Sequence, residues 1–337
     1  MGAYDFSSND LDEQNVLAYL SGRGFGFAAD SKVRQLGGGV SNVVLAVGEG
    51  PGSIVVKQAL PRLRVADEWL APRERALVEA EALDLVNRIT PGAAPHVLDR
   101  DPERCALVIE RAPSGWEDWK SLLLAGTIEP KIGAGLGSVL SSWHNATFVS
   151  TLSPLFSDRE PFEALRIDPY YRTVARRLPL MARWVRHYVD EMQARRLCIV
   201  HGDFSPKNVL VGPEPELWVI DFEVAHLGDP AFDVAFLLCH LMLKSLHRPE
   251  QAVGYDRCAV EFASTYQTGA RAELAPQWEY VLGHVGCLLL ARVEGKSPAE
   301  YLTAEERSQA QRFGEILVSG PPPSPLDLAA VRQLACK

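Results

Sequence analysis

Two apolar runs that end in acidic and amide side chains constrain what this chain can fold into more than any other part of its sequence. The first run is IVHGDFSPKNVLV, in which Ile199 and Val200 lead into His201, Asp203 and Asn208 before the chain becomes apolar again. Asp and Asn are common in turns because their side chains bond nearby backbone groups, so a purely structural turn accounts for this run taken alone. A site of chemistry is the alternative, and the rest of the sequence decides between the two.

The second run, LWVIDFEVAHLGDPAFDVAFLL, follows shortly after and ends its apolar stretch in Asp221 and Glu223. Mg²⁺ prefers carboxylate, amide, water and phosphate oxygens, so Asp221 and Asn208 are suitable ligands for an ion bound to a nucleotide. Asp203 would then face an incoming hydroxyl group, orient it and accept its proton as the bond to phosphorus forms. Together the two runs indicate phosphoryl transfer.

The region before these two runs is rich in glycine. The stretch KVRQLGGGVSNVVLAVGEGPGSIVVKQAL has short β-branched segments separated by glycines, which predicts antiparallel strands joined by hairpins. Its triple glycine contains Gly38 and Gly39, with Ser41 and Asn42 just after it, and such a loop lets backbone N–H groups approach a phosphate closely. An ordinary glycine hairpin is the alternative interpretation.

Lys57 ends the apolar segment SIVVK, soon after the glycine-rich loop. A lysine at this place is where a nucleotide phosphate clamp is expected, although a lysine at a strand end more often faces solvent. The helix predicted over PRERALVEAEALDLV follows and carries Glu79 and Glu81. We expect one of these carboxylates to pair with Lys57, unless both face solvent.

The remaining pattern predicts an α+β chain whose sheet comes first. A short helix is expected from Leu11 to Leu20, before the sheet, and a further strand at CALVIER. After residue 112 the apolar spacing becomes mostly helical. The expected later helices include residues 131–147, 178–196, 231–245 and 277–293.

Composition argues against several partners. The 337 residues are 47% hydrophobic and carry a formal net charge of −9, without a cluster of Lys and Arg that would follow a nucleic-acid backbone. The six cysteines show no Cys-x-x-Cys spacing, which favours a reduced setting without zinc. The first residues lack the pattern of a signal peptide, and no apolar run reaches the ~20 residues of a membrane span. We therefore expect a soluble cytoplasmic protein that binds neither nucleic acid nor membranes.

The motifs HGDFSPKNVLV and VIDFEVAHLGDPAFDVA resemble the catalytic and metal-binding loops of the aminoglycoside phosphotransferase-like kinases, which are relatives of the protein kinases. VVKQALPRLRVADEW and RALVEAEAL are similar to the N-lobe of 5-methylthioribose kinase. The resemblance covers about residues 30–295 and implies a bilobal protein-kinase-like fold. It implies a β-rich, ATP-binding N-lobe at residues 1–110 and a mainly helical C-lobe at residues 111–337, which holds the two loops and the acceptor pocket.

The resemblance also implies residue roles. Asp203 corresponds to the catalytic aspartate, and His201 belongs to the same catalytic loop, which it would brace. Asp233 would tie down that loop from the following helix. The implied cofactors are ATP and Mg²⁺. The metal ligands would be Asn208 and Asp221 with Glu223 as a further one, and the nucleotide would contact Gly38, Gly39, Ser41, Asn42, Lys57 with its partner Glu79, and the hinge from Glu110 to Ala112.

The chain also departs from methylthioribose kinases. Those enzymes read His-Gly-Asp-Leu-His-Thr-Gly-Ser and Asp-Pro-Glu where this chain has HGDFSPKN and DFE, and their arginine pair near the C-terminus has no clear counterpart. Only Arg292 and Lys296 in LLLARVEGKSPAEYL offer a substrate contact, and both also fit as favourable cations at a helix C-terminus. These departures leave the identity of the acceptor undecided. They do not affect the prediction that the chain catalyses phosphoryl transfer.

The leading hypothesis is an ATP- and Mg²⁺-dependent kinase of a hydroxyl on a small sugar- or polyol-like metabolite, with methylthioribose as the nearest named acceptor. An aminoglycoside kinase is an alternative, and it needs an acidic pocket that the acids of SDREPFEALRIDPYY would supply. A kinase of hydroxyacyl-CoA esters and a catalytically inactive pseudokinase scaffold are further alternatives. A homodimer also stays open, because Trp116 and Trp119 near the hinge could mark an interface.

Overall fold

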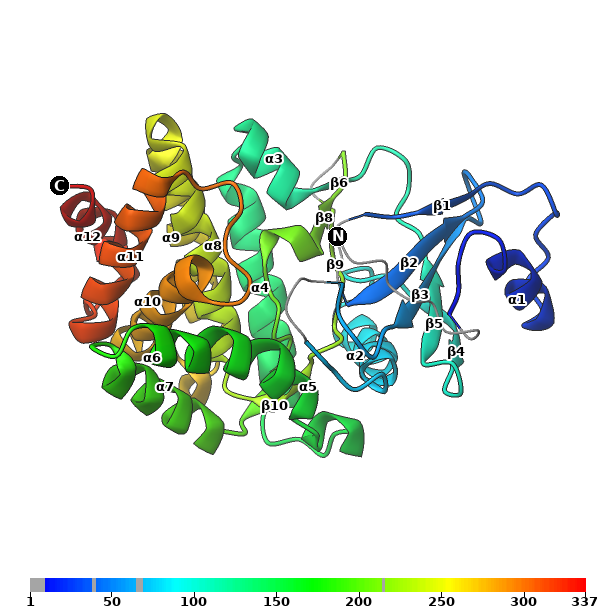
Figure 1. Cartoon of the computed structure of the whole chain (residues 1–337), viewed down its shortest axis with the longest axis horizontal. Helices are drawn as coiled ribbons and strands as arrows, with labels where there is room; N and C mark the ends of the chain where they lie inside the picture. The colour runs from blue at the N-terminus through cyan, green and yellow to red at the C-terminus, as the bar shows by residue number, and fades with distance from the viewer. Residues whose placement is uncertain (1–9, 38–40, 65–68, 214–215) are drawn as a thin grey trace.

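The computed structural model describes residues 10–37, 41–64, 69–213 and 216–337. Its N-terminal part is built on one antiparallel sheet with the strand order β1-β2-β3-β5-β4, which confirms the strands predicted from the glycine-rich texture (Figure 1). The strands of this sheet are β1 (Val33–Gln35), β2 (Asn42–Val47), β3 (Ile54–Ala59), β4 (Val97–Asp101) and β5 (Ala106–Glu110).

Helices cover both faces of this sheet, and this coverage decides where Lys57 points. Helix α1 (Val16–Gly22) packs on the face that includes Val56, and α2 (Arg75–Ile89) packs on the face that includes Val55. Because successive side chains of a strand point to opposite faces, Lys57 shares the α2 face with Val55. Strand β3 is therefore buried along its whole length.

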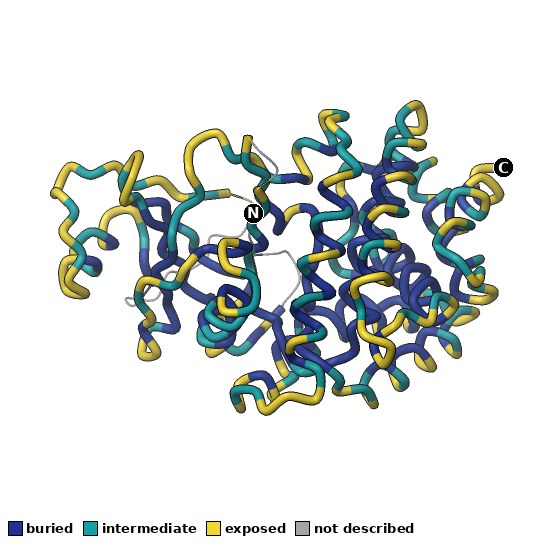
Figure 2. Tube along the Cα trace, turned by 180° about the vertical axis from the view of Figure 1, so that it is seen from behind, coloured by how far each residue is buried: buried dark blue, intermediate teal, exposed yellow. Residues whose placement is uncertain are grey.

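The part of the chain after β5 is mainly helical, as predicted (Figure 1). The four helices expected at residues 131–147, 178–196, 231–245 and 277–293 correspond to α4, α7, α8 and α10. Two of them, α8 and α10, are buried almost throughout, and Figure 2 shows the buried trace gathered in the interior of this helical part. The helices are α3 (Trp119–Ala125), α4 (Pro130–Thr147), α5 (Glu160–Phe162), α6 (Thr173–Arg177), α7 (Ala182–Ala194), α8 (Ala231–His247), α9 (Ala252–Gly269), α10 (Trp278–Glu294), α11 (Ala304–Ser319) and α12 (Leu328–Ala335).

Two short ladders bring the acidic runs of the sequence together. Strand β7 pairs with β10, and β8 pairs with both β9 and β6, all antiparallel. The first loop, residues 201–208, joins β7 to β8, and the second loop, residues 220–225, joins β9 to β10. Because each loop runs between strands that pair with those of the other loop, the two loops lie side by side. These strands are β6 (Glu117–Asp118), β7 (Cys198–Val200), β8 (Val209–Val211), β9 (Leu217–Val219) and β10 (His226–Gly228).

Two segments differ from the sequence-based expectation. The first helix begins at Val16 rather than Leu11, because the Asp12 carboxylate accepts the N–H groups of Gln14 and Asn15 and holds a turn there. Residues Glu163–Arg172 form a π-helical segment, η2, between α5 and α6. Such segments often occur at functional sites, and this one brings an arginine to the first loop.

The sheet ends with β5 at Glu110, which is where the N-lobe of residues 1–110 was expected to meet the C-lobe of residues 111–337. That boundary stays a prediction. In the part of the chain that the structure describes, no helix combines the length and the apolar character that a membrane crossing requires.

Candidate active site

Lys57 on β3 joins the sheet to both α2 and the second loop. Its Nζ lies 2.6 Å from Glu79 Oε1 and 2.7 Å from Asp221 Oδ1. The predicted contact with Glu79 is therefore present, whereas Glu81 faces Arg100 instead, at 3.6 Å. Burial alone would lower the pKa of Lys57, but the charges of Asp221 and Glu79 outweigh it and hold the pKa above its usual range. Lys57 is a fixed cation at this place.

Asp203 on the first loop is held between two cations. Its Oδ1 lies 2.9 Å from Arg166 Nη2, and its Oδ2 lies 2.9 Å from Lys207 Nζ. Burial alone would raise the pKa of Asp203, but the charges of Arg166 and Lys207 hold it below its usual range. Asp203 is therefore ionised at neutral pH, as a proton acceptor must be.

Asn208 is bonded to Asp203 and to Ile220, the residue before Asp221. Asn208 Nδ2 donates to Asp203 Oδ2 at 2.7 Å, so the amide nitrogen is engaged and the amide oxygen is the atom suited to a metal. The Ile220 N–H donates to Asn208 O at 3.0 Å, which fixes the residue before Asp221. Asp221 itself has a φ of 72°, a conformation that non-glycine residues rarely adopt and that is frequent at functional sites.

His201 and Asp233 brace the two loops. Asp233 accepts the N–H of His201 at 2.7 Å and that of Gly202 at 2.9 Å, so the predicted tie from the following helix is present. The Asp203 N–H donates to His201 Nδ1 at 3.0 Å, and His201 Nε2 donates to Ile220 O at 3.1 Å. Burial lowers the pKa of His201, which keeps the ring neutral. Both ring nitrogens form hydrogen bonds with backbone groups, which fits the predicted brace of the loop. The catalytic assignment of His201 stays a prediction.

Glu223 pairs with an arginine that the sequence interpretation missed. Its Oε2 lies 2.9 Å from Arg75 Nε and accepts from Asn42 Nδ2 at 2.8 Å, while its Oε1 accepts from Ser41 Oγ at 2.7 Å. Both carboxylate oxygens are thus engaged, which disfavours the predicted role of Glu223 as a further metal ligand. The available signal was Arg75 itself, which stands four residues before Glu79 and therefore on the same helix face.

The glycine-rich loop is described only at its edges. The predicted phosphate contacts Gly38 and Gly39 lie outside the described residues. The side chains of Ser41 and Asn42 are directed to Glu223, so only their backbone groups stay candidates for a nucleotide. Arg75 Nη2 also bonds Ser41 O, which fastens this end of β2 to α2.

The predicted hinge begins at the end of β5. The Glu110 N–H donates to His96 O, and Glu110 Oε2 accepts the His96 N–H, both at 3.0 Å. Glu110 thus closes the β4–β5 edge, and Ala112 follows two residues later. The adenine contact of Glu110 and Ala112 stays a prediction.

Arg292 and Lys296 lie beside the η2 segment. Arg292 Nη1 lies 2.9 Å from Ser297 Oγ and 3.4 Å from Tyr170 Oη, and Lys296 Nζ lies 3.0 Å from Asp168 Oδ2. Arg292 stands in the last turn of α10, as the helix-terminus interpretation requires, but it also contacts the segment that supplies Arg166 to Asp203. Both interpretations of Arg292 therefore remain compatible with the structure.

Trp116 and Trp119, which follow the predicted hinge, lie in different environments. Trp119 is fully buried, so it belongs to the core and not to an interface. Trp116 is half-buried against Trp218, with ring centroids 5.2 Å apart.

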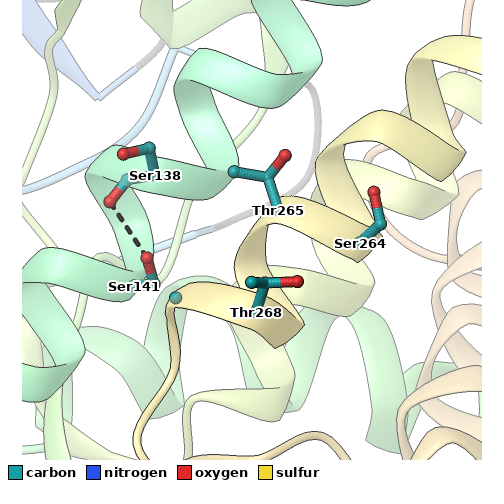
Figure 3. Close-up of a pocket in the computed structure, with 6 residues that line it drawn as sticks. Ser138, Ser141, Ser264, Thr265 and Thr268 are labelled. Carbon is teal, nitrogen blue, oxygen red and sulfur yellow. Dashed lines mark hydrogen bonds between the residues drawn. The ribbon is translucent and has the colours of Figure 1, made fainter.

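A shallow pocket lies apart from the predicted site residues, between α4 and α9 (Figure 3). It measures about 330 Å³, and hydroxyl side chains line it without a charged group. None of the predicted site residues lines it, so it contributes nothing to the chemistry of the two loops. Its lining residues are Ser138, Ser141, Ser264, Thr265, Thr268 and Gly269.

Comparison with known proteins agrees with this arrangement. Residues 32–276 match the model of the phosphotransferase enzyme family (APH). The methylthioribose kinase of Bacillus cereus (strain AH820) is 28% identical over 276 residues, which cover 72% of this chain and 69% of that protein. The methylthioribose kinase of Bacillus thuringiensis (strain Al Hakam) is 27% identical with the same coverage.

Solved structures show the same architecture. The amicoumacin kinase hAmiN superposes over 95% of this chain and 97% of its own, with a TM-score of 0.59 and 16% identity. The choline kinase LicA from Streptococcus pneumoniae superposes over 91% of this chain and 98% of its own, with a TM-score of 0.53 and 16% identity. These similarities show the protein-kinase-like fold that the sequence predicted, and the family model spans more than half of the chain. The chain therefore belongs to the phosphotransferase enzyme family and is an ATP-dependent small-molecule kinase.

Proposed function

We propose that this kinase uses ATP and Mg²⁺ to phosphorylate a hydroxyl group of a small sugar- or polyol-like metabolite. The observation that carries the proposal is a chain of bonds: Lys57 pairs with Asp221, Ile220 next to Asp221 donates its N–H to Asn208 O, and Asn208 donates to Asp203. It combines a fixed cation, a pair of oxygen ligands and an ionised carboxylate, which are the parts that phosphoryl transfer requires. A scaffold without catalysis needs none of them.

The nucleotide would bind between the sheet and the two loops. Lys57 would contact its phosphates, with Glu79 fixing the ammonium in place, and the hinge from Glu110 to Ala112 would hold the adenine. The complex of hAmiN contains AMP-PNP and Ca²⁺, which supports a nucleotide with a divalent cation as the arrangement to test here.

The residues present fit Mg²⁺. This ion is typically held by one or two carboxylates together with phosphate oxygens and water, rather than by a closed protein cage. Asp221 and the amide oxygen of Asn208 supply such a partial set, and the described residues contain no cluster of three or more His, Cys, Asp or Glu that would suit another metal. When bound, Mg²⁺ neutralises charge on the phosphates. Glu223 is left out of this set because Arg75 holds it.

Asp203 would orient the acceptor hydroxyl and take its proton. The hydroxyl oxygen forms the new bond to the γ-phosphorus, the bond from that phosphorus to the ADP oxygen breaks, and the proton passes to the carboxylate. Arg166 and Lys207 keep that carboxylate ionised and in place beforehand. Methylthioribose is the nearest named acceptor, since relatives at 27–28% identity are named methylthioribose kinases.

The test is a screen of acceptor-dependent ADP release with ATP and Mg²⁺. The acceptors are methylthioribose, other sugars and polyols, aminoglycosides, amino alcohols and hydroxyacyl-CoA esters. We expect release with a sugar- or polyol-like acceptor, and its loss in Asp221→Ala, which removes a metal ligand while Lys57 keeps Glu79 as its partner. Near wild-type turnover in that variant would show that the metal assignment is wrong.

A further inference from the structure

Lys244 is a buried lysine without a carboxylate partner. It lies on α8 with 1% of its surface exposed, and its Nζ lies 3.4 Å from His240 O and 5.7 Å from the centre of the Tyr301 ring. Among the described residues, no carboxylate forms an ion pair with it. An unpaired buried charge is costly, and burial together with the charges of Lys120 and Arg292 lowers the pKa of Lys244 to about 7.

The polar groups beside Lys244 are hydrogen-bond donors. Arg292 Nε and Tyr301 Oη are both buried and lack a hydrogen-bond partner among the described residues. Burial raises the pKa of Tyr301, so its hydroxyl keeps its proton. A guanidinium N–H, an ammonium and a phenol O–H can all donate to the same ligand. The ligand that suits them is an anion that accepts several hydrogen bonds.

A continuous row of side chains connects this place to the catalytic carboxylate. Arg166, which binds Asp203, lies with its guanidinium carbon 5.7 Å from the Tyr170 ring and 5.8 Å from the Phe236 ring. The Phe236 ring lies 5.1 Å from the ring of His240. His240 is four residues after Phe236 and four before Lys244, so the three stand on one face of α8.

The pKa of His240 reflects the positive charge of this region. Burial and then the charges of Lys244, Arg292, Lys207 and Lys120 all lower its pKa, and Lys207 is the residue that binds Asp203. Cations on α3, α8, α10 and the first loop therefore all act on His240, although the whole chain carries a formal net charge of −9.

The nearby carboxylates are engaged elsewhere. Asp118, whose charge acts weakly on Lys244, caps α3 by accepting the Ser121 N–H at 2.9 Å. Asp168 pairs with Arg176 and Lys296. Of the acids in the stretch that an aminoglycoside kinase would use, Asp168 and Glu163, which pairs with Arg172, are thus already neutralised by arginine or lysine side chains.

We propose that the acceptor carries an anionic group, a carboxylate or a phosphate monoester, and that a basic cluster of Lys120, Lys244 and Arg292 with the Tyr301 hydroxyl binds this group. The inference rests on the proposed function and specifies the chemical class of its acceptor. The anion would occupy the basic cluster while the hydroxyl to be phosphorylated reaches Asp203. Neutral sugars and cationic drugs lack the anionic group that this cluster would bind.

The test measures anion binding first, without turnover. Thermal unfolding is followed with Mg²⁺ and ADP present, in sodium phosphate, sodium D-ribonate, D-ribose or sodium chloride of matched ionic strength. The variants are Lys244→Met and, as a matched control, Lys131→Met, since Lys131 is an exposed lysine on α4. Lys244→Met should fold, because an apolar side chain of similar length replaces an unpaired buried charge.

We expect phosphate or ribonate to raise the Tm of wild type and Lys131→Met, relative to chloride and ribose, and to leave that of Lys244→Met unchanged. A rise with phosphate only identifies a phosphate monoester, and a rise with ribonate only identifies a carboxylate. An equal rise in wild type and Lys244→Met, or no anion-specific rise in wild type, overturns the proposal.

Turnover then separates this inference from the proposed function. ADP release is compared for D-ribose, D-ribonate, D-ribose 5-phosphate, choline and kanamycin. An anionic acceptor should exceed its neutral counterpart in kcat/KM by about tenfold or more, and Lys244→Met should remove that preference. If the protein prefers ribose, choline or kanamycin, the proposal of an anionic acceptor is wrong, but the proposed kinase activity is supported. A failure of ATP to raise the Tm of wild type contradicts the proposed function instead, whatever the anions do.

Discussion

Arg75 Nε lies 2.9 Å from Glu223 Oε2, and this ion pair joins α2 to the loop that carries Asp221. The two side chains are 0% and 6% exposed, so solvent screens their attraction little. Arg75 Nη2 also donates to Leu60 O at 2.9 Å, next to the end of β3. One guanidinium therefore fixes the sheet, α2 and the second loop relative to one another.

Glu223→Gln should destabilise the protein without weakening its metal binding. The change leaves Arg75 as a buried charge without its counter-ion, and breaking a buried pair in this way costs about 3–5 kcal/mol. Urea unfolding measures this loss, and titration of ATP-dependent activity with Mg²⁺ measures the metal affinity.

The matched control for that change is Glu81→Gln. Glu81 faces Arg100 in a pair whose side chains are 30% and 41% exposed, so the change should cost less than about 1 kcal/mol. If Glu223→Gln instead weakens Mg²⁺ binding and leaves the free energy of unfolding unchanged, Glu223 is a metal ligand as the sequence suggested.

Lys57→Met should weaken the use of ATP severely. A positioned cation on developing phosphate charge is worth on the order of 3 kcal/mol, which corresponds to about a hundredfold in kcat/KM for ATP. Steady-state kinetics at varied ATP measure this. Lys32→Met is the control, because Lys32 belongs to the same part of the chain but pairs with Glu49 in solvent, with 74% of its side chain exposed. Unchanged kinetics in a folded Lys57→Met protein would remove Lys57 from the site.

The contact between Lys57 and Glu79 could be predicted because it follows from local order. A strand after a glycine-rich loop presents Lys57 on the face of the sheet that the next helix covers, and Glu79 stands on that helix. The meeting of the two loops was also predictable, since each acidic group ends an apolar run and such runs pair as strands.

The partners of the acidic groups could not be predicted in the same way. Arg166 reaches Asp203 from a π-helical segment that contains Pro169. The spacing of residues in the sequence does not predict this geometry. Arg75 was visible in the sequence, but its contact with Glu223 depends on how α2 is placed against the second loop. Long-range placement of charged side chains is set by the packed fold, and periodicity reports only which face of an element they occupy.

The stability of the protein should fall as the pH drops from about 6.5 to about 4. Burial lowers the pKa of His226 to about 4 and that of His284 to about 3, and it lowers that of His201 as well. In this window the unfolded chain binds protons at these histidines while the folded chain does not, so protonation favours unfolding. For His226 alone the loss reaches on the order of 3 kcal/mol at pH 4.

The variant His226→Gln isolates this contribution. His226 Nδ1 donates to Val224 O at 3.0 Å, and a glutamine amide can donate in its place but does not titrate. The free energy of unfolding, measured by urea at several pH values, should depend less steeply on pH in the variant, by up to one proton. Parallel pH profiles of the two proteins would show that His226 titrates normally in the folded chain.

Asp203→Asn should abolish most turnover and leave nucleotide binding intact. The change keeps the size of the side chain and its ability to form turn hydrogen bonds, but it removes the charge that accepts the proton of the acceptor. A positioned general base contributes about 10²–10⁴-fold, so kcat should fall within that range. A loose transition state, in which the proton leaves late, would place the loss at the lower end.

One side effect of this change, a loss of stability, can be separated from the chemistry. Arg166, with 8% of its side chain exposed, loses its counter-ion, so the variant should also be less stable and must be assayed below its own unfolding temperature. Nucleotide affinity is measured in parallel, because Lys57, Asn208 and Asp221 are unchanged and ATP with Mg²⁺ should still bind. If Asp203 only shaped a turn, asparagine would serve equally well and acceptor-dependent ADP release would survive. A scaffold would give no phosphorylated product from either protein, so the pair of measurements distinguishes the base from both alternatives.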